Sequence, residues 1–288
     1  MLNLFRHLSH ILSPTPVLIS DSPRMLKSTR RHPSQRNWWT TLLLSVVMWG
    51  STSGLVVAAS PETAPTELKN LLMQIDETAN RQDLEAVMAF YSENFQHSDG
   101  LTPQNLRTSL AQLWQNYTDL NYETELTNWE QQGDTITAET ITKITGMQTV
   151  GGREMRLLAT IRARQHYQGN QIIEQKILAE QTQIKIGENP PTVIVYAPDE
   201  VKVNQEYNFD AIVEEPLGEQ MLIGAITQEP IQAKTYFNQP ALDWELLNAG
   251  GLFKLGRASE LPENTWISAV LIREGGITLV SHRLQVVD

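Results

Sequence analysis

Beyond position 60, the apolar residues first recur at helical spacing. The first such segment spans residues 66–80, and its apolar positions are Leu68, Leu71, Leu72 and Ile75. The spacing i, i+3, i+4, i+7 predicts a helix with one buried face, for which Thr66 is a suitable N-cap. Asp83 is placed to cap a second helix, whose apolar positions continue to Phe95. A third helix is predicted after Thr102, because the proline that follows suits a first helical turn.

After Asp119 the apolar period changes from 3.6 to 2, the period of strands. Four strand-like segments follow, at residues 121–131, 135–149, 153–168 and 171–187. The turns between them are Gly133-Asp134, Gly151-Gly152 and Gly169-Asn170, which are typical of tight hairpins. Three helices followed by a long antiparallel meander predict an α+β domain over residues 66–187.

A second, all-β domain is predicted over residues 192–288. Two prolines in the segment 188–191 can extend neither a helix nor a ladder, so we read that segment as a linker. The strand-like runs beyond it are Thr192–Ala197, Tyr207–Glu214, Gln220–Thr227, Ile231–Phe237, Asp243–Leu247, Leu252–Leu255, Thr265–Glu274 and Ile277–Val287. The last two runs are apolar on both faces, which predicts a central hairpin. Eight short strands indicate a β-sandwich that is immunoglobulin-like in architecture alone.

The first 59 residues have the features of a secretory leader. Its basic positions before the apolar stretch are Lys27, Arg30, Arg31 and Arg36. The apolar stretch begins at Trp38, and the small residues before position 60 suit cleavage after Ala59. We therefore expect residues 1–59 to be a leader, residues 60–65 a short linker, and the chain to be exported to the periplasm or beyond.

Two alternatives to this leader stay open. Residues 38–59 form a stretch long enough to cross a bilayer, so an uncleaved membrane anchor is the other interpretation. Residues 1–24 do not fit a signal, and a start at Met25 would give a leader of conventional length.

Composition and charge exclude several classes of function. The chain has no cysteine, so it forms no disulfide and has no thiol nucleophile or thiolate metal site. Residues 1–59 hold six of the 22 basic residues and one of the 33 acidic ones, which leaves residues 60–288 with 16 basic and 32 acidic residues. A body this acidic is expected to repel nucleic acid and anionic membranes. Membrane contact is expected only through an uncleaved leader.

Three stretches resemble the nuclear-transport-factor-2-like superfamily, which includes SnoaL-like and ketosteroid-isomerase-like proteins. They are residues 84–95, residues 97–100 and the last strand pair, residues 157–186. The resemblance covers residues 66–187 and implies a cone, in which the curved sheet surrounds the helices and leaves an apolar pocket. Members include isomerases, dehydratases, epoxide hydrolases and non-catalytic binding domains, so the fold does not decide the function. Members also often dimerise through the sheet, which implies a homodimer.

Two groups of residues are weighed as catalytic. Asp99 stands where ketosteroid-isomerase-like members place a carboxylate base, but the first helix has no tyrosine to serve as the oxyanion donor. Arg162 and Glu174 lie on neighbouring predicted strands, where an arginine between acids would suit an epoxide-hydrolase-like site. Cross-strand ion pairs on a solvated face are the simpler interpretation of these charges.

The remaining candidates belong to a pocket. Its predicted lining residues are Tyr91, His97, Trp114, Tyr117, Trp129, Arg162 and Glu174. After the leader, the only histidines are His97, His166 and His282, and none has the spacing of a metal site. We expect no metal and no cofactor.

Two functions remain after these considerations. The first is an exported, non-catalytic module that binds a small apolar ligand or a protein partner, with the second domain used for docking. The alternative is a small-molecule isomerase or hydrolase that uses Asp99 or the Arg162–Glu174 group. A tyrosine hydroxyl and Asp99 facing one enclosed, ligand-sized space would favour the enzyme.

Overall fold

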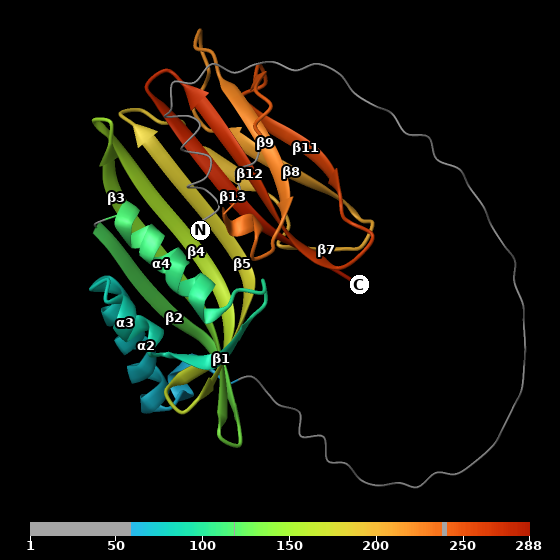
Figure 1. Ribbon diagram of the computed structural model, residues 1–288. Coiled ribbons are helices and arrows are strands. Elements are labelled where there is room, and N and C mark those ends of the chain that lie inside the picture. Colours follow the sequence, from blue (N-terminus) through green and yellow to red (C-terminus); the bar gives the residue numbers. More distant parts are fainter. Residues whose placement is uncertain (1–58, 118, 238–240) are drawn as a thin grey trace, which may run out of the picture. The chain divides into compact units, whose positions relative to one another are not determined.

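A computed structural model describes residues 59–117, 119–237 and 241–288 (Figure 1). All of these described residues belong to one compact unit. The predicted leader, apart from Ala59, lies outside the described residues, and so do Met25 and the predicted anchor segment. Among the described residues, no helix is both long enough and apolar enough to span a membrane.

Three α-helices form near the sequence positions that predict them. They are α2 (Thr66–Asn80), α3 (Leu84–Met88) and α4 (Pro103–Asn116), and a short 3-10 helix, η1 (Pro61–Thr63), precedes them. Asp83 caps α3, since its Oδ1 accepts a hydrogen bond from the Ala86 amide at 3.1 Å. Thr102 and Asn105 form a reciprocal capping box at the start of α4. Thr66 is the first residue of α2 rather than its cap.

The second helix is shorter than predicted. It ends at Met88, and strand β1 (Tyr91–His97) follows it. β1 runs parallel to β5 (Gln171–Gly187), and Tyr91 lies opposite Ile172. The backbone amides and carbonyls of β1 find hydrogen-bond partners on β5, whereas in a longer helix they would bond within the helix. This long-range pairing outweighs the helical spacing of the apolar residues.

The predicted meander is confirmed. Its strands are β2 (Asp119–Gln132), β3 (Thr135–Val150), β4 (Arg153–Gln168) and β5, each antiparallel to the next. Gly133 and Gly169 adopt φ values of 60° and 57° in the hairpin turns, a region that glycine enters without strain. The meander and the helices enclose apolar side chains of both, such as Leu113 of α4 and Ile144 of β3.

The C-terminal segment is built almost entirely of strands. These are β6 (Val193–Tyr196), β7 (Glu200–Lys202), β8 (Glu206–Val213), β9 (Ile223–Pro230), β10 (Glu245–Leu246), β11 (Gly251–Arg257), β12 (Glu263–Arg273) and β13 (Gly276–Val287). Two details differ from the sequence expectation. Residues 231–237 form no strand and contain the 3-10 helix η2 (Thr235–Phe237), and the short β7 is not predicted by the pattern.

One sheet crosses the predicted domain boundary. The ten-stranded sheet has the order β10-β9-β12-β13-β5-β4-β3-β2, with β1 and β7 paired off this path to β5 and β13. β13 pairs with β5 from His282↔Gln181 to Gly276↔Gly187. A three-stranded sheet, β11-β8-β6, packs over the C-terminal part of the large sheet. Separate folding of the segments on either side of residues 188–191 stays a prediction, and the shared sheet weighs against it.

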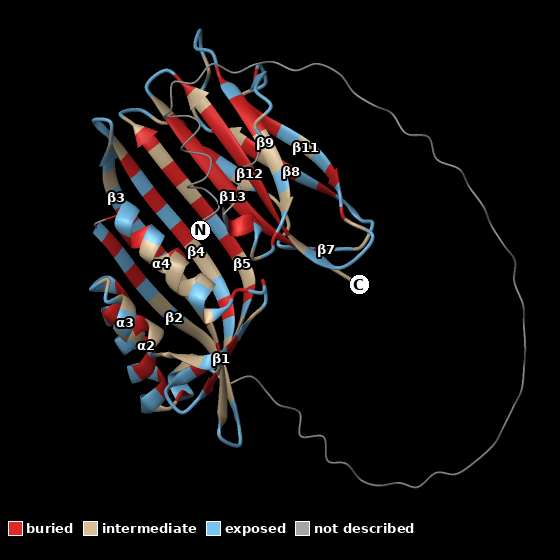
Figure 2. Cartoon of the chain, in the orientation of Figure 1, coloured by how far each residue is buried: buried red, intermediate tan, exposed pale blue. Residues whose placement is uncertain are grey.

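The β12–β13 hairpin is central, as its apolar residues on both faces predict. Figure 2 shows that both strands are buried along most of their length. Val270 and Leu279 belong to the core under the helices, whereas Ala269 and Val280 belong to the core under the three-stranded sheet. The hairpin therefore contributes side chains to both of these cores.

Candidate functional site

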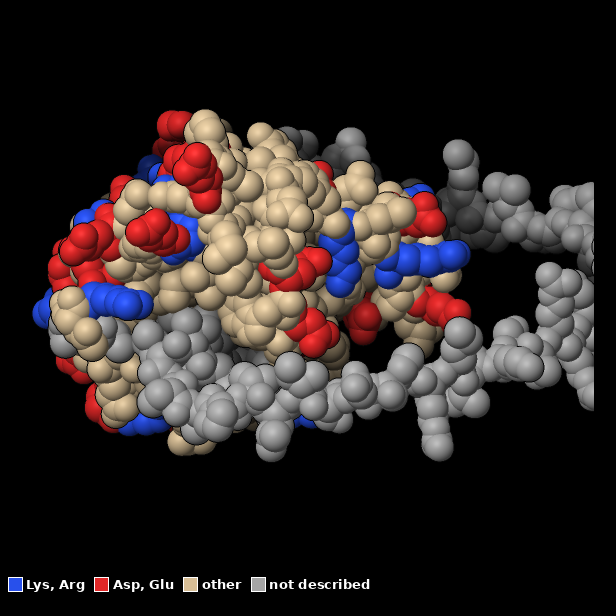
Figure 3. Space-filling model, turned by 90° about the horizontal axis from the view of Figure 1, so that it is seen from above, with Lys and Arg blue, Asp and Glu red and all other residues tan. Residues whose placement is uncertain are grey.

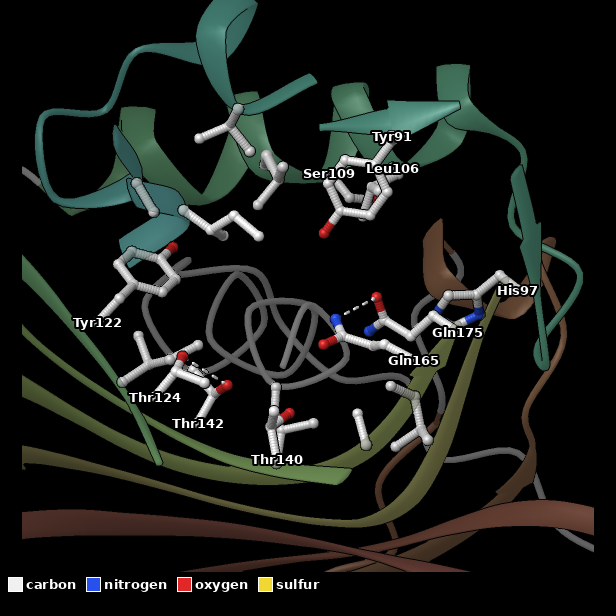
Figure 4. A pocket seen from close by; sticks show the side chains of 18 of the residues that line it. Tyr91, His97, Leu106, Ser109, Tyr122, Thr124, Thr140, Thr142, Gln165 and Gln175 are labelled. Carbon is white, nitrogen blue, oxygen red and sulfur yellow. Dashed lines mark hydrogen bonds between the residues drawn. The ribbon is translucent and has the colours of Figure 1, made fainter. Parts of the chain in front are cut away.

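A cavity of about 210 Å³ lies between the helices and the concave face of the sheet (Figure 4). Its walls are mainly apolar, with side chains from α2, α4 and the strands such as Leu72, Leu110, Leu113, Ile144 and Ile161. Helical stripes face strand residues here because both present their apolar side inward. The cavity is therefore the interior of the cone that the resemblance implies.

Polar side chains stand at two places along the wall. Thr124 Oγ1 donates to Asp76 at 2.7 Å, and the Thr124 and Thr142 hydroxyls are 3.0 Å apart. Farther along the sheet, Gln165 Nε2 donates to Gln175 Oε1 at 3.3 Å, and Figure 4 shows both amides at the cavity. These groups make the cavity mostly apolar with a few fixed hydrogen-bonding positions, as small-molecule sites usually are.

Two phenols add to this lining. Trp114 Nε1 donates to the Tyr122 hydroxyl at 2.9 Å. The Tyr91 hydroxyl points into the cavity in Figure 4. Burial raises the pKa of Tyr91 to about 12, so its phenol stays neutral at ordinary pH.

A buried ionic cluster contributes to the wall of the cavity. Arg283, in β13, makes a bidentate pair with Asp99 at 3.0 and 2.8 Å, and the same guanidinium donates to Glu180 at 3.1 Å. Tyr236, in η2, donates to Asp99 at 2.6 Å, and Trp266 donates to Glu180 at 3.2 Å. Glu180, Tyr236 and Arg283 line the cavity.

The turn after β1 is shaped to hold Asp99 in this cluster. Gly100 has a φ of 74°, and its amide donates to the His97 carbonyl at 2.9 Å. The Asp99 amide donates to His97 Nδ1 at 3.1 Å, so Nδ1 carries no proton. Ser98 Oγ donates to Asp99 at 3.2 Å and accepts from the Ile177 amide at 3.2 Å, which ties the turn to β5.

The charges of the cluster set its protonation states. Burial alone would raise the pKa of Asp99, but the hydrogen bonds and charge of Arg283 outweigh it and hold that pKa below its ordinary value. Burial, with the charge of Asp99, raises the pKa of Tyr236 well above its ordinary value. Burial lowers the pKa of His97, with Asp99 partly opposing it. The cluster is therefore a carboxylate held by a phenol and a guanidinium beside a neutral imidazole.

This geometry argues against Asp99 as a general base. A carboxylate has about four acceptor positions, and Asp99 accepts two hydrogen bonds from Arg283, one from Tyr236 and one from Ser98. Asp99 is also not among the residues that line the cavity. A lowered pKa makes it a weak base in addition.

The structure brings together only part of the predicted pocket set. Tyr91, His97 and Trp114 line the cavity, as predicted. Tyr117 is fully buried in the core beside it, and Trp129 lies against η1, where its Nε1 donates to Ser60 O and Thr63 Oγ1, both at 3.2 Å. Neither of these two aromatic side chains is part of the lining.

Arg162 and Glu174 lie on the exposed face of the sheet. Glu174 in β5 pairs there with His166 in β4 at 3.3 Å. Arg164, also in β4, pairs with Glu139 in β3. This is the cross-strand ion pairing that the simpler interpretation expects. The parity of β4 explains it, since Ala163 and Gln165 take the positions that face the cavity.

Sequence reasoning missed Tyr236, Trp266 and Arg283, the C-terminal members of the cluster. One signal was present for Arg283: it is the one arginine or lysine in residues 277–287, a run whose pattern predicts a central strand. A charge in a strand that is buried on both faces needs an ionic partner. Tyr236 and Trp266 carry no comparable signal.

Within the described residues, no group of three or more His, Asp or Glu side chains is arranged to hold a metal ion.

The C-terminal segment matches a family model. That model is described as "Domain of unknown function (DUF8623)", and it matches residues 188–287. Its first residue falls in the segment read as a linker. Tyr236, Trp266 and Arg283 all lie within the matched range. No curated protein matched the sequence.

Solved structures show a limited similarity. Bd1075 of Bdellovibrio bacteriovorus is 18% identical with a TM-score of 0.28, and the match covers 38% of this chain and 39% of that chain. An LEH-like epoxide hydrolase of M. tuberculosis is 13% identical, with a TM-score of 0.28 and coverage of 39% and 81%. A SnoaL-like polyketide cyclase of Agrobacterium tumefaciens is 13% identical, with a TM-score of 0.29 and coverage of 39% and 91%.

These similarities include SnoaL-like and epoxide-hydrolase-like proteins, over about two fifths of the chain and at low identity. They assign no activity. Neither they nor the family model supports the immunoglobulin-like architecture expected for residues 192–288.

Proposed function

We propose that this chain is an exported, non-catalytic protein whose cone-shaped interior binds a small, mostly apolar molecule. The observation that carries the proposal is the cavity of about 210 Å³ with its mainly apolar wall. An apolar cavity of about 150 Å³ is large enough for benzene, so this one suits a bicyclic molecule. Burial of the apolar surface of the ligand would drive binding.

The ionic cluster supports binding rather than catalysis. The acceptor positions of Asp99 are filled by Arg283, Tyr236 and Ser98, so none is left to take a proton from a substrate. The tyrosine hydroxyl nearest to Asp99, that of Tyr236, is directed at the carboxylate itself. We therefore propose that the cluster closes the cavity and joins the C-terminal segment to the cone.

The acidic surface suits a role without nucleic acid. On the face shown in Figure 3, lysine and arginine side chains lie among acidic ones and do not gather into one patch. With 32 acidic and 16 basic residues over 60–288, the chain is expected to repel a polyanion. The proposed partner is a small neutral molecule.

Filling the cavity tests the proposal. Tetralin, an uncharged bicyclic hydrocarbon, is titrated into the full chain by calorimetry. In Ala163→Leu, extra methyl groups occupy the cavity wall, and we expect tetralin affinity to fall by about tenfold or more. Ala89→Leu adds the same atoms at an exposed position and serves as the control. Absence of tetralin binding to the wild-type chain, or equal affinity in Ala163→Leu, would contradict the proposal.

A further inference from the structure

Several hydrogen-bond donors along the cavity have no acceptor among the described residues. Gln175 Oε1 already accepts from Gln165, which leaves the Gln175 Nε2 donor without a partner among the described residues. The Tyr122 oxygen accepts from Trp114, and its own proton has no acceptor among those residues. The Tyr91 hydroxyl makes no hydrogen bond within the described chain. Polar groups in an apolar wall are costly unless something pairs with them.

Two of these donors, the Tyr91 hydroxyl and Gln175 Nε2, belong to side chains that line the same cavity. Figure 4 shows the Tyr91 hydroxyl pointing into the cavity, toward the paired amides of Gln165 and Gln175. Tyr91 begins β1 and Gln175 lies in β5, and these strands are paired from Tyr91↔Ile172 to His97↔Gln175. The ring of Tyr91 also packs edge-on against Phe95, with centroids 4.9 Å apart. The donors are therefore held by paired backbone rather than by a mobile loop.

The charges in the cavity lining disfavour an anion. The acidic side chains that line the cavity are Asp76 and Glu180, and the one arginine in the lining, Arg283, already donates to Asp99 and Glu180. Burial keeps Tyr91 neutral, since its pKa is raised to about 12. Neutral donors near carboxylates suit an uncharged acceptor, such as a carbonyl oxygen.

We propose that the molecule bound in the cavity is neutral, of bicyclic size, and carries an uncharged acceptor oxygen that the Tyr91 hydroxyl and the Gln175 amide bind. This inference rests on the proposed binding function and adds the chemical class of the ligand. The apolar side chains around the cavity hold the hydrocarbon body of the ligand, and the two donors fix its orientation.

A matched pair of probes tests the inference. 1-Tetralone carries a carbonyl that tetralin lacks, and the two are otherwise alike in size. Each is titrated into the wild-type full chain, Tyr91→Phe and Tyr196→Phe. Tyr91→Phe removes one hydroxyl that has no partner in the described chain and keeps the ring, so the fold is expected to persist. Tyr196→Phe is the control at an exposed tyrosine.

We expect the ratio of tetralone to tetralin affinity to fall about fivefold in Tyr91→Phe and to stay unchanged in Tyr196→Phe, as loss of one neutral hydrogen bond predicts. An unchanged ratio in Tyr91→Phe, with tetralin still bound, overturns the inference and leaves the binding function standing. Failure of the wild-type chain to bind tetralin overturns both. Tighter binding of tetrahydro-1-naphthoate than of 1-tetralone also overturns the inference, because the preferred ligand is then an anion.

Discussion

Arg283 connects the two segments of the chain at the level of single atoms. Its guanidinium is fully buried and donates to Asp99 and Glu180, which lie 184 and 103 positions earlier in the sequence. Removing one partner of a buried pair leaves an uncompensated charge in a medium of low polarity. The stability of the whole chain therefore depends on this residue.

Replacing Arg283 by methionine keeps most of the side-chain volume and removes the charge. We expect the free energy of unfolding at pH 7 to fall by about 3–5 kcal/mol, measured by urea denaturation. Arg257→Met, at an exposed position, is the control, with an expected change within about 0.5 kcal/mol.

The same variant has a distinct pH dependence. Arg283 holds the pKa of Asp99 below its ordinary value, so near pH 4 the unfolded chain binds more protons than the folded one. Wild-type stability should therefore be complete above the unfolded pKa of about 3.9 and fall as the pH drops through the folded value. This acid-induced loss should be smaller in Arg283→Met. Equal loss in both proteins would show that the pair does not stabilise the fold.

At the scale of single residues, the sequence could indicate that Asp99 lies near a pocket, but it could not indicate which side chains pair with it. The resemblance to a cone-fold superfamily places Asp99 after the second helix, at the mouth of a pocket. Tyr236 and Arg283 reach it from the other segment, and no local pattern reports a contact across so many residues. The parity of β4 could in turn indicate that Arg162 faces solvent, as it does.

Among the elements, those set by local patterns were predictable. The boundaries of α2 and β4 follow from apolar spacing and glycine turns. β1 was not predictable, because its residues also fit a helical stripe and only the edge of β5 selects the strand. The continuation of the sheet from β5 to β13 likewise depends on a pairing between segments that a proline linker separates.

This strand pair allows a test of the predicted boundary at residues 188–191. Residues 60–189 and 190–288 are expressed apart. Each piece lacks one side of the β5–β13 ladder, so we expect each to unfold at a lower urea concentration than the joined chain. If neither piece gives dispersed amide resonances, the predicted boundary is wrong. Equal stability of residues 60–189 and the joined chain would mean that the shared ladder stabilises nothing.

For the whole molecule, export is the untested prediction with the simplest measurement. We expect the exported protein to begin at Ser60, because the small residues before it suit signal peptidase. Cleavage there would remove the backbone pairing of Ala59 with Trp129 and keep the contact of Trp129 with Ser60. N-terminal sequencing of the exported protein measures this. An intact segment 38–59 in the membrane fraction would contradict it.

Part of the cavity wall is supplied by residues that also hold the C-terminal segment in place. Tyr236 and Arg283 line the cavity and bind the turn that follows β1. If the cavity binds the proposed ligand, binding and the association of the two segments are thermodynamically linked, and each favours the other by the same free energy. A molecule that binds only the form with both segments in contact would raise the population of that form, so the empty protein would be easier to unfold than the saturated one.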